Sequence, residues 1–533
     1  MKITSAARWP AVVLLFTAAL VTPSHAAQAA PVNCLAPVPS TTRPGYSIAD
    51  PNCDLNGTPF QPLTDASGNP VSKTYTGIED GAAFRMEVPL NWNGELVVFA
   101  HGYRGAGATV RVDNPDLRAH YVARGFAWAA SSYQTNGYDV GQGVRDSHAL
   151  IAQFARVHGT AAHNVYLTGG SMGGHVTVVA IEQFRGSFVG AMPYCGALDG
   201  VKLFDYFLDA TVTAAALARV PVQFPLEPSA DFPTTFRATV DDITAALGVD
   251  VGRPPNLTPA GRQWSDAVER RSGGERPGFE STFAYWNAIR GLRPNNDMPF
   301  LFGLYPGLDG GTAGIADGNI TSNRSTWYEL DDHWLPSADE IKLNLTALRV
   351  DRTAQPSPDL SGVPRVHGDP RIPVLSLHNV GDLFVPFSLE QVYAAAAGSH
   401  GHSRLFVSRA IRANGHCDFT GAELAQGFDD LVSWVRTGHR PAGDAILDRR
   451  VVARDDFGCQ FTVGVRADFV APACPDLYPH GSYGGGGTNH QTTATDPSTV
   501  ASGAVQAGSS QPGSGGHRPP RQSMAMPIRA SAQ

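Results

Sequence analysis

Residues 164–180 read NVYLTGGSMGGHVTVVA, in which two apolar runs enclose four glycines around Ser171 and Met172. Glycine inside a strand or a helix costs roughly 0.5–1 kcal/mol relative to alanine, so this cluster indicates a sharp turn or a close approach of backbones. The stretch therefore predicts a buried strand, a tight turn at Ser171 and a buried helix.

The segments on both sides of this stretch alternate between strand and helix patterns. Apolar runs at 125–133 and 187–194 are typical of buried strands, and residues 140–159 carry apolar side chains at helical spacing. The alternation returns with a strand at 372–382 and continues through a helix, a strand and a helix. This order predicts an α/β fold with a mostly parallel central sheet and helices on both faces.

The interruption of this alternation predicts the domain organisation. A sheet that stops and is later completed implies an insertion, which we expect to form a largely helical cap. The low-complexity composition of the C-terminal residues predicts a disordered tail. The expected parts are an irregular N-terminal segment (30–72), the first part of the core (73–196), the cap (197–371), the second part of the core (372–440), a C-terminal extension (441–479) and the tail (480–533).

Residues 1–29 have the pattern of a secretory signal peptide. Lys2 and Arg8 precede an apolar run that is followed by small-residue cleavage options. No other stretch approaches the 18 apolar residues of a membrane span, so we expect no integral membrane segment in the mature chain. A secreted protein, extracellular or periplasmic, is predicted. The formal charge of -8 and the lack of a basic run make nucleic acid a poor candidate partner.

The turn at residues 169–173 matches G-x-S-x-G, the pattern of a nucleophile elbow between a strand and a helix. The pattern alone has low specificity, because 57 of the 533 residues are glycine. A serine hydroxyl is a poor nucleophile and needs a base, an orienting acid and donors for the developing oxyanion. We therefore looked for these groups around Ser171, the predicted nucleophile.

Asp382 is the predicted acid and His416 the predicted base. Asp382 directly follows a strand in LHNVGDLFVP, although a turn or helix-capping aspartate would have the same pattern. His416 lies in ANGHCDF, between the last strand and the last helix, where a solvated loop histidine is the alternative. His378 precedes the acid within its strand, and His400 and His402 precede the last strand, so these fit worse.

The oxyanion donors are predicted to be the backbone N–H groups of Met172 and Tyr103. Met172 begins the helix after the serine, and Tyr103 lies in the loop HGYRG after a strand. Two such donors are worth roughly 3–4 kcal/mol each to a transition state. The alternative is a glycine-rich loop without this role.

Through HGYRG, GGSMGG, NVGD and GHC the chain resembles the α/β-hydrolases, over roughly residues 75–195 and 370–437. It is most similar to secreted bacterial esterase-type members with a large cap. The resemblance implies hydrolysis of carboxylic esters through an acyl-serine intermediate, without a cofactor. No CxxC or clustered Cys/His pattern in the sequence suggests a metal site. Feruloyl esterase and tannase relatives place a cysteine beside the serine. Gly170 occupies that position here, so we do not assign the chain to that group.

Two alternatives stay open. A secreted serine peptidase of the prolyl-peptidase type shares the fold and the order of the triad, but usually has tyrosine where this chain has Met172. A binding protein on an inactive hydrolase scaffold is the other. The substrate, a small or polymeric ester, and the oligomeric state cannot be predicted. Aromatic residues of the cap could line a pocket or form the cap's own core: Phe204, Tyr206, Phe207, Tyr285, Trp286 and Trp327.

The six cysteines fit three disulfides, although 15 pairings are possible. Cys34 and Cys53, and likewise Cys459 and Cys474, are close in sequence in segments poor in regular structure. Cys195 and Cys417 remain, and the predicted fold places both at the C-terminal edge of the sheet. We predict this third pair, with two buried free thiols as the alternative.

Overall fold

The computed structural model describes residues 34–224, 232–249, 255–289, 299–303, 316 and 318–475. The predicted signal peptide (1–29) and the predicted tail (480–533) lie outside the described residues.

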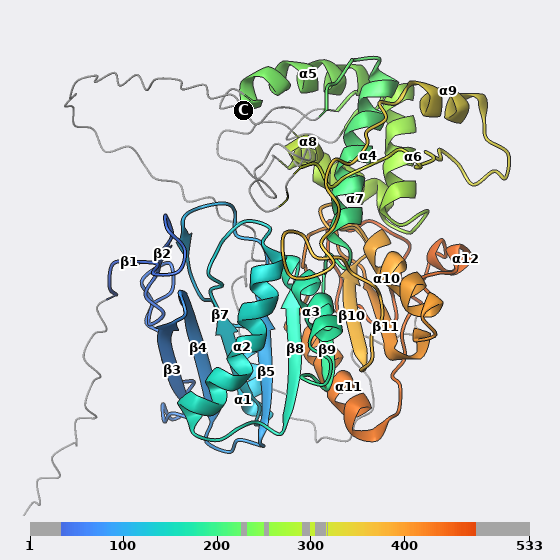
Figure 1. The fold of residues 1–533 in the computed structure, drawn as a ribbon. Coiled ribbons are helices and arrows are strands. Elements are labelled where there is room, and N and C mark those ends of the chain that lie inside the picture. The colour runs from blue at the N-terminus through green and yellow to red at the C-terminus, as the bar shows by residue number, and fades with distance from the viewer. Residues whose placement is uncertain are drawn as a thin grey trace, which may run out of the picture.

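An eight-stranded sheet forms the body of the molecule (Figure 1). Strand β4 pairs antiparallel with β3 and β7, and the other pairs are parallel, which confirms the predicted α/β fold with a mostly parallel sheet. The serine strand β8 lies in the interior, between β5 and β9. Across the sheet the strands are β3 (Ser72–Glu79), β4 (Ala82–Pro89), β7 (Ala127–Ser131), β5 (Glu95–Ala100), β8 (Asn164–Gly170), β9 (Gly190–Tyr194), β10 (Val374–Asn379) and β11 (Phe406–Ile411).

Both faces of the sheet are buried, as a parallel sheet requires. In β5, Leu96 and Val98 belong to one apolar core, while Val97 and Phe99 belong to the core on the opposite face. This division follows from the alternation of side chains along a strand, and it explains why the run LVVFA that follows Glu95 is apolar throughout.

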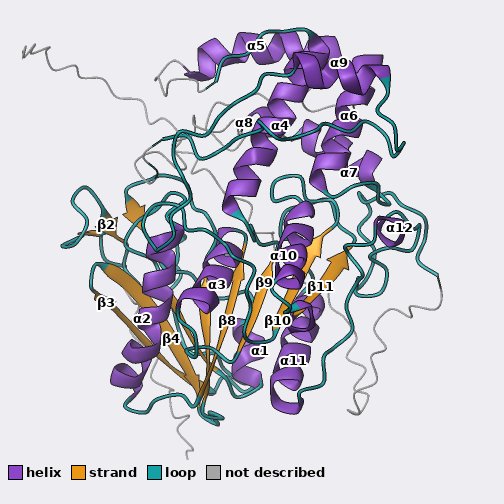
Figure 2. Cartoon of the chain, turned by 45° about the vertical axis from the view of Figure 1, so that its right-hand side comes forward, coloured by secondary structure: helices purple, strands orange, loops and turns teal. Residues whose placement is uncertain are grey.

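Helices cover each face of the sheet (Figure 2). Apolar residues of α2 (Val140–His158), α3 (Met172–Gln183) and α10 (Ser388–Ser399) build the first core. Those of α1 (Arg118–Ala123) and α11 (Gly421–Thr437) build the second. Helix α1 could not be predicted from the sequence, because its six residues are too few to show a helical period.

The N-terminal segment is less irregular than expected. Strands β1 (Val38–Pro39), β2 (Ser47–Ile48) and β6 (Thr109–Val110) form a small sheet in the order β1-β2-β6. Each of these strands has two residues, which is too short for an alternating pattern to be visible in the sequence. A short 3-10 helix, η1 (Ser403–Leu405), precedes β11. Between β11 and residue 475, where the described part of the chain ends, the helices are α11 and the short α12 (Arg449–Val452).

The segment between β9 and β10 forms a helical layer over the carboxyl ends of the parallel strands (Figure 1). Its first helix, α4, extends from the sheet into this layer. The described helices are α4 (Gly200–Ala218), α5 (Phe232–Leu247), α6 (Pro259–Ser272), α7 (Phe279–Ala288), α8 (Phe300–Gly303) and α9 (Ala338–Thr346).

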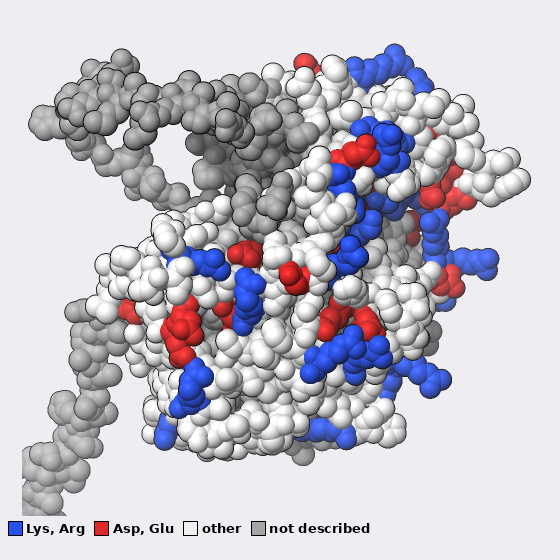
Figure 3. Space-filling view, viewed as in Figure 1, with Lys and Arg blue, Asp and Glu red and all other residues white. Residues whose placement is uncertain are grey.

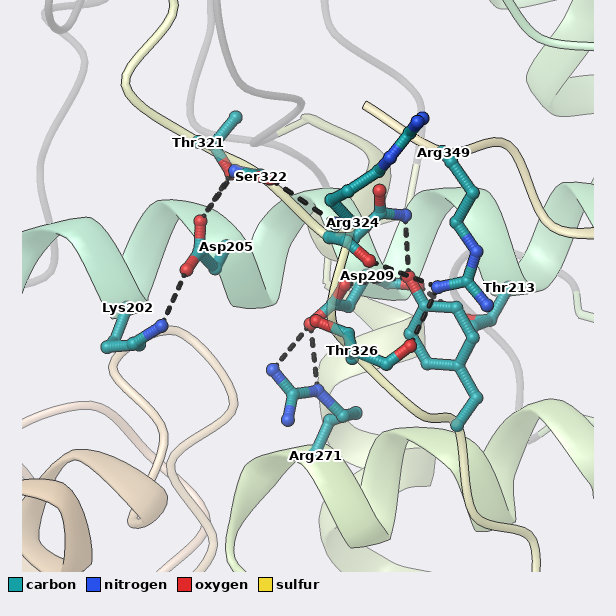
Figure 4. A network of polar contacts seen from close by, with 12 residues as sticks. Lys202, Asp205, Asp209, Thr213, Arg271, Thr321, Ser322, Arg324, Thr326 and Arg349 are labelled. Carbon is teal, nitrogen blue, oxygen red and sulfur yellow. Dashed lines mark hydrogen bonds and ion pairs between the residues drawn. The ribbon is translucent and has the colours of Figure 1, made fainter. Parts of the chain in front are cut away.

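Buried charges hold this layer together (Figure 4). Asp209 on α4 accepts hydrogen bonds from Arg271 of α6 at 2.8 Å and from the Tyr328 hydroxyl at 2.8 Å. One turn earlier, Asp205 accepts from Thr321 at 2.9 Å. Burial raises the pKa of the Asp209 carboxyl, although the adjacent Arg271 opposes that shift. These bonds fix the chain around Thr321 and Tyr328 to α4 without a helix of its own.

Lys, Arg, Asp and Glu side chains are interspersed over the face drawn in Figure 3, rather than segregated by sign. Within the described residues, no helix combines the length and the apolar composition that crossing a lipid bilayer requires.

Candidate active site

Ser171 lies at the turn between β8 and α3 with φ 58° and ψ -125°, a region that side-chain-bearing residues rarely adopt. The Ser171 N–H donates to the carbonyl of Tyr194 at 3.1 Å, and the Ser171 carbonyl accepts from Gly174 at 2.9 Å. Backbone on both sides of the serine therefore maintains this strained conformation.

The glycines around Ser171 are required by close contacts. A Cβ at Gly173 would lie 2.0 Å from the carbonyl oxygen of Ala100, and one at Gly170 would lie 2.5 Å from the Tyr194 ring. A Cβ at Gly169 would lie 2.5 Å from the carbonyl oxygen of Gly173. Helix α3 can approach β5 and β8 this closely only without side chains, which is the reason for the glycine cluster.

Asp382 and His416, 34 residues apart, are in direct contact. The Nδ1 atom of His416 lies 2.6 Å from Oδ2 of the fully buried Asp382. The other oxygen, Oδ1, accepts from the backbone N–H groups of Phe384 at 2.9 Å and Val385 at 3.0 Å. A carboxylate in this position accepts a hydrogen bond from a proton on Nδ1, and the other ring nitrogen, Nε2, lies 3.5 Å from Sγ of Cys417.

Two further attachments hold the His416 loop, which joins β11 to α11. The Asn379 side chain donates to the carbonyl of Asp418 at 2.9 Å and accepts from its N–H at 3.1 Å. Cys417 forms a disulfide with Cys195, with a Cα–Cα distance of 5.2 Å. The loop is thus tied to the ends of both β10 and β9.

The disulfide connects the His416 loop to the serine turn. Cys195 follows Tyr194, whose carbonyl accepts from Ser171, and Cys417 follows His416. Both cysteines have positive φ, 41° for Cys195 and 57° for Cys417, so two strained residues lie at the ends of one cross-link. The other cysteines form the two pairs favoured by the sequence, Cys34–Cys53 and Cys459–Cys474.

Cys195, His416 and Cys417 place potential metal-ligating atoms within 4.8 Å of one another. Both sulfur atoms belong to the disulfide, however, and a metal would need thiolates. We therefore interpret this group as a structural cross-link beside an imidazole.

The predicted oxyanion loop lies against Ser171. A Cβ at Gly102 would lie 3.1 Å from Cβ and 3.6 Å from Oγ of the serine. Behind it, the His101 ring stacks on Tyr133 at 3.8 Å and forms a hydrogen bond with the carbonyl of Gly102 at 2.7 Å. Burial, assisted by the nearby charge of Arg104, lowers the pKa of His101 to about 3, so this imidazole is neutral and acts as a support for the loop.

Comparisons with known proteins give distant relatives. No protein-family profile matches the chain. The o-phthalyl amidase of Xanthobacter agilis is 24% identical over 421 residues, which cover 68% of this chain and 87% of that protein. Among solved structures, feruloyl esterase B from Aspergillus oryzae is 15% identical with a TM-score of 0.38, covering 77% of this chain and 86% of that one. The acylaminoacyl peptidase of Pyrococcus horikoshii is 10% identical with a TM-score of 0.32, covering 72% and 43%.

The chain's own architecture decides the fold. A strained serine links an interior strand of the eight-stranded sheet to the next helix, and the acid and the histidine follow it in the order Ser171, Asp382, His416. The chain has the α/β-hydrolase fold.

Sequence reasoning missed a buried ion pair beneath the acid turn of this α/β-hydrolase. His378, considered only as a poorer base, is fully buried on β10. Its Nε2 donates to the carbonyl of Val385 at 2.8 Å, and its Nδ1 lies 3.2 Å from Glu390. The signal was three polar residues, Ser376, His378 and Asn379, within a strand that the sequence predicts to be buried.

The cap aromatics divide into different environments. Phe207 stacks on Phe384 with 6.2 Å between the ring centroids, and the Phe384 centroid lies 4.9 Å from that of His416, so two phenyl rings connect α4 to the His416 ring. Trp327 is 48% exposed, and Tyr285 is half-buried. The remaining three are buried: Phe204, Tyr206 and Trp286.

Proposed function

We propose that this chain is a secreted serine hydrolase that cleaves carboxylic esters with Ser171, Asp382 and His416 as its triad. The hydrogen bond of 2.6 Å between His416 and Asp382 carries the proposal. This bond orients the imidazole so that it can act as a general base. The loop that carries His416 is cross-linked to Cys195, the residue after the hydrogen-bond partner of Ser171.

The proposed reaction has two steps. Nε2 of His416 takes the proton of the Ser171 hydroxyl as Oγ attacks the ester carbonyl, and it returns that proton to the departing alkoxide. Water then attacks the acyl-serine with the same base, which releases the acid and restores the hydroxyl. The N–H groups of Met172 and Tyr103 stabilise the negative oxygen, and the N-terminal end of α3 adds its positive dipole.

Amide hydrolysis is the second candidate. The curated relative that covers 68% of this chain is named an o-phthalyl amidase, and the same triad can protonate a departing nitrogen through His416. The choice between ester and amide depends on which leaving group the cap admits.

Secretion is part of the proposal. Three disulfides, closed over separations of 19, 222 and 15 residues, favour an oxidising compartment outside the cytosol. This agrees with the signal-peptide pattern of residues 1–29.

Rates on p-nitrophenyl esters of graded acyl length, measured beside matched p-nitroanilides and an o-phthalyl amide, test the function. We expect turnover of at least one ester and covalent labelling of Ser171 by a fluorophosphonate. An enzyme that cleaves only amides would move the assignment to the second candidate. A chain that neither turns over substrate nor labels would favour the binding-protein alternative.

A further inference from the structure

One helix of the cap bonds to both loops that carry the proposed acid and base. The indole Nε1 of Trp286, on α7, lies 2.8 Å from the carbonyl oxygen of Gly381 and 2.8 Å from that of Asn414. Gly381 directly precedes Asp382, and Asn414 is two residues before His416. A single N–H donor is thus shared between the two loops, at a site where Trp286 is only 3% exposed.

The indole lies where these loops begin to separate. The pairing of β10 with β11 continues past the strands, through bonds from Val380 to Ile411 at 2.8 Å and from Gly381 to Ala413 at 3.0 Å. Beyond these bonds the acid turn and the base loop follow different courses. Trp286 therefore bonds to both segments just past these backbone bonds, one residue before Asp382 and two residues before His416.

A second residue of α7 strengthens this attachment. The Thr282 hydroxyl donates to Oδ1 of the buried Asn414 at 2.8 Å. A Cβ at Gly381 would lie 2.6 Å from the same hydroxyl and 2.5 Å from the carbonyl oxygen of Ala413. Glycine at 381 therefore allows α7 to contact the acid turn directly.

We propose that Trp286 is a positioning residue, which holds Asp382 and His416 in register by bonding to the carbonyls of Gly381 and Asn414. This inference rests on the proposed function. The cap then supports the triad mechanically, in addition to covering the site. Misplacing a catalytic group by about 1 Å can lower the rate by roughly 100-fold, so a small drift of either loop is enough to be measured.

The alternative is that Trp286 only fills space in the cap, since its ring also packs on Phe300 at 4.6 Å. The chain offers a matched control for this alternative. Trp264 on α6 is also a buried indole, and its Nε1 donates to the carbonyl of Ala210 at 2.9 Å, within the cap itself. Phenylalanine at either position removes one N–H donor and part of one buried ring.

The experiment compares Trp286→Phe with Trp264→Phe by thermal melting, by kcat and KM on a p-nitrophenyl ester, and by the downfield proton signal of the His416–Asp382 hydrogen bond. We expect similar losses of Tm in both variants. Only Trp286→Phe should lower kcat, by roughly 10- to 100-fold with little change in KM, and broaden or remove the downfield signal. A Trp286→Phe enzyme with the kcat and the proton signal of Trp264→Phe would overturn the inference.

Fluorophosphonate labelling separates this inference from the proposed function. If wild-type Ser171 is not labelled, the proposed function fails. If the wild type is labelled and Trp286→Phe is labelled at the same rate, only the positioning role fails. Should Trp286→Phe not fold, Thr282→Val removes one hydroxyl from the same attachment, and an unchanged kcat in that variant would overturn the inference.

Discussion

Ser171 and Tyr194 are joined by a backbone hydrogen bond of 3.1 Å, and the residue after Tyr194 is the cysteine that is cross-linked to the His416 loop. The serine turn and the base loop, which come from distant parts of the chain, are therefore connected by one hydrogen bond, one peptide and one disulfide. Both cysteines hold a positive φ, a conformation that costs on the order of 1–3 kcal/mol at each residue. Removing the cross-link would let both residues relax.

The double variant Cys195→Ser with Cys417→Ser is expected to lose activity before it loses its fold. Relaxation at residue 417 moves the adjacent His416, so kcat should fall more steeply than Tm. The control removes Cys34 and Cys53, whose bond lies in the N-terminal segment, and it should keep kcat. Equal kcat values in the two double variants would show that the bond does not position the base.

Ser171→Ala and His416→Ala are each expected to lower kcat by roughly 10⁴- to 10⁶-fold, with similar effects, because triad members act as a unit. Asp382→Asn should lower kcat by a smaller factor than either alanine variant. Steady-state kinetics after confirmation of the fold by circular dichroism provide the measurement. Full activity of either alanine variant would remove that residue from the mechanism.

Gly173→Ala is expected to destabilise the protein by more than about 3 kcal/mol, since its Cβ would meet the carbonyl oxygen of Ala100 at 2.0 Å. The matched control is Gly398→Ala in α10, where a Cβ meets nothing within 4 Å. That change should be neutral or should stabilise by up to about 1 kcal/mol. Chemical denaturation of both variants gives the comparison, and a mild effect at residue 173 would contradict the close approach of α3 to β5.

The buried pair of His378 and Glu390 predicts a pH dependence of stability. Burial lowers the pKa of His378, but the hydrogen bond and charge of Glu390, with Asp382 and the Val385 carbonyl, outweigh it and raise the pKa above its ordinary value. The folded state then binds this proton more tightly than the unfolded state does. Its contribution to stability is complete below about pH 6.5 and is lost as the pH rises through the raised pKa.

The free energy of unfolding, measured from pH 6 upwards, should therefore fall in the wild type and fall less in His378→Asn. Replacement of His163, whose side chain is 61% exposed, by glutamine should keep the wild-type slope. Identical slopes in all three proteins would show that the His378 pair does not titrate in this range.

The sheet could be predicted because its strands are long apolar runs separated by turn residues, as in ELVVFA and NVYLTG. The candidate triad could be proposed from the sequence because Ser171 interrupts one such run, and Asp382 and His416 lie in the turns that follow two others. The shared indole bond could not be predicted, because Trp286 is 95 residues from Gly381 and 128 from Asn414. Local patterns contain no information about a contact between a cap helix and two strand ends.

Short elements and buried polar contacts account for most of the other differences. Strands of two residues, such as β1 and β2, are stabilised by their partners rather than by their own composition. The buried bond between Asp209 and Arg271 inside the cap could not be predicted either, because a charged residue in a helix is ordinarily assigned to the side that faces solvent.

The separation of 222 residues between Cys195 and Cys417 also fixes an order in time. A ribosome completes the serine turn first, then every described cap helix, and only afterwards the strands that lead to the acid and the base. The Cys34–Cys53 bond, over 19 residues, can close once both cysteines reach an oxidising compartment, whereas the long bond must wait until residue 417 has reached it as well. A half-made chain therefore carries Ser171 without its base. On the proposed chemistry, the nascent chain cannot hydrolyse a substrate until the segment that carries His416 has been made and docked beside the serine turn.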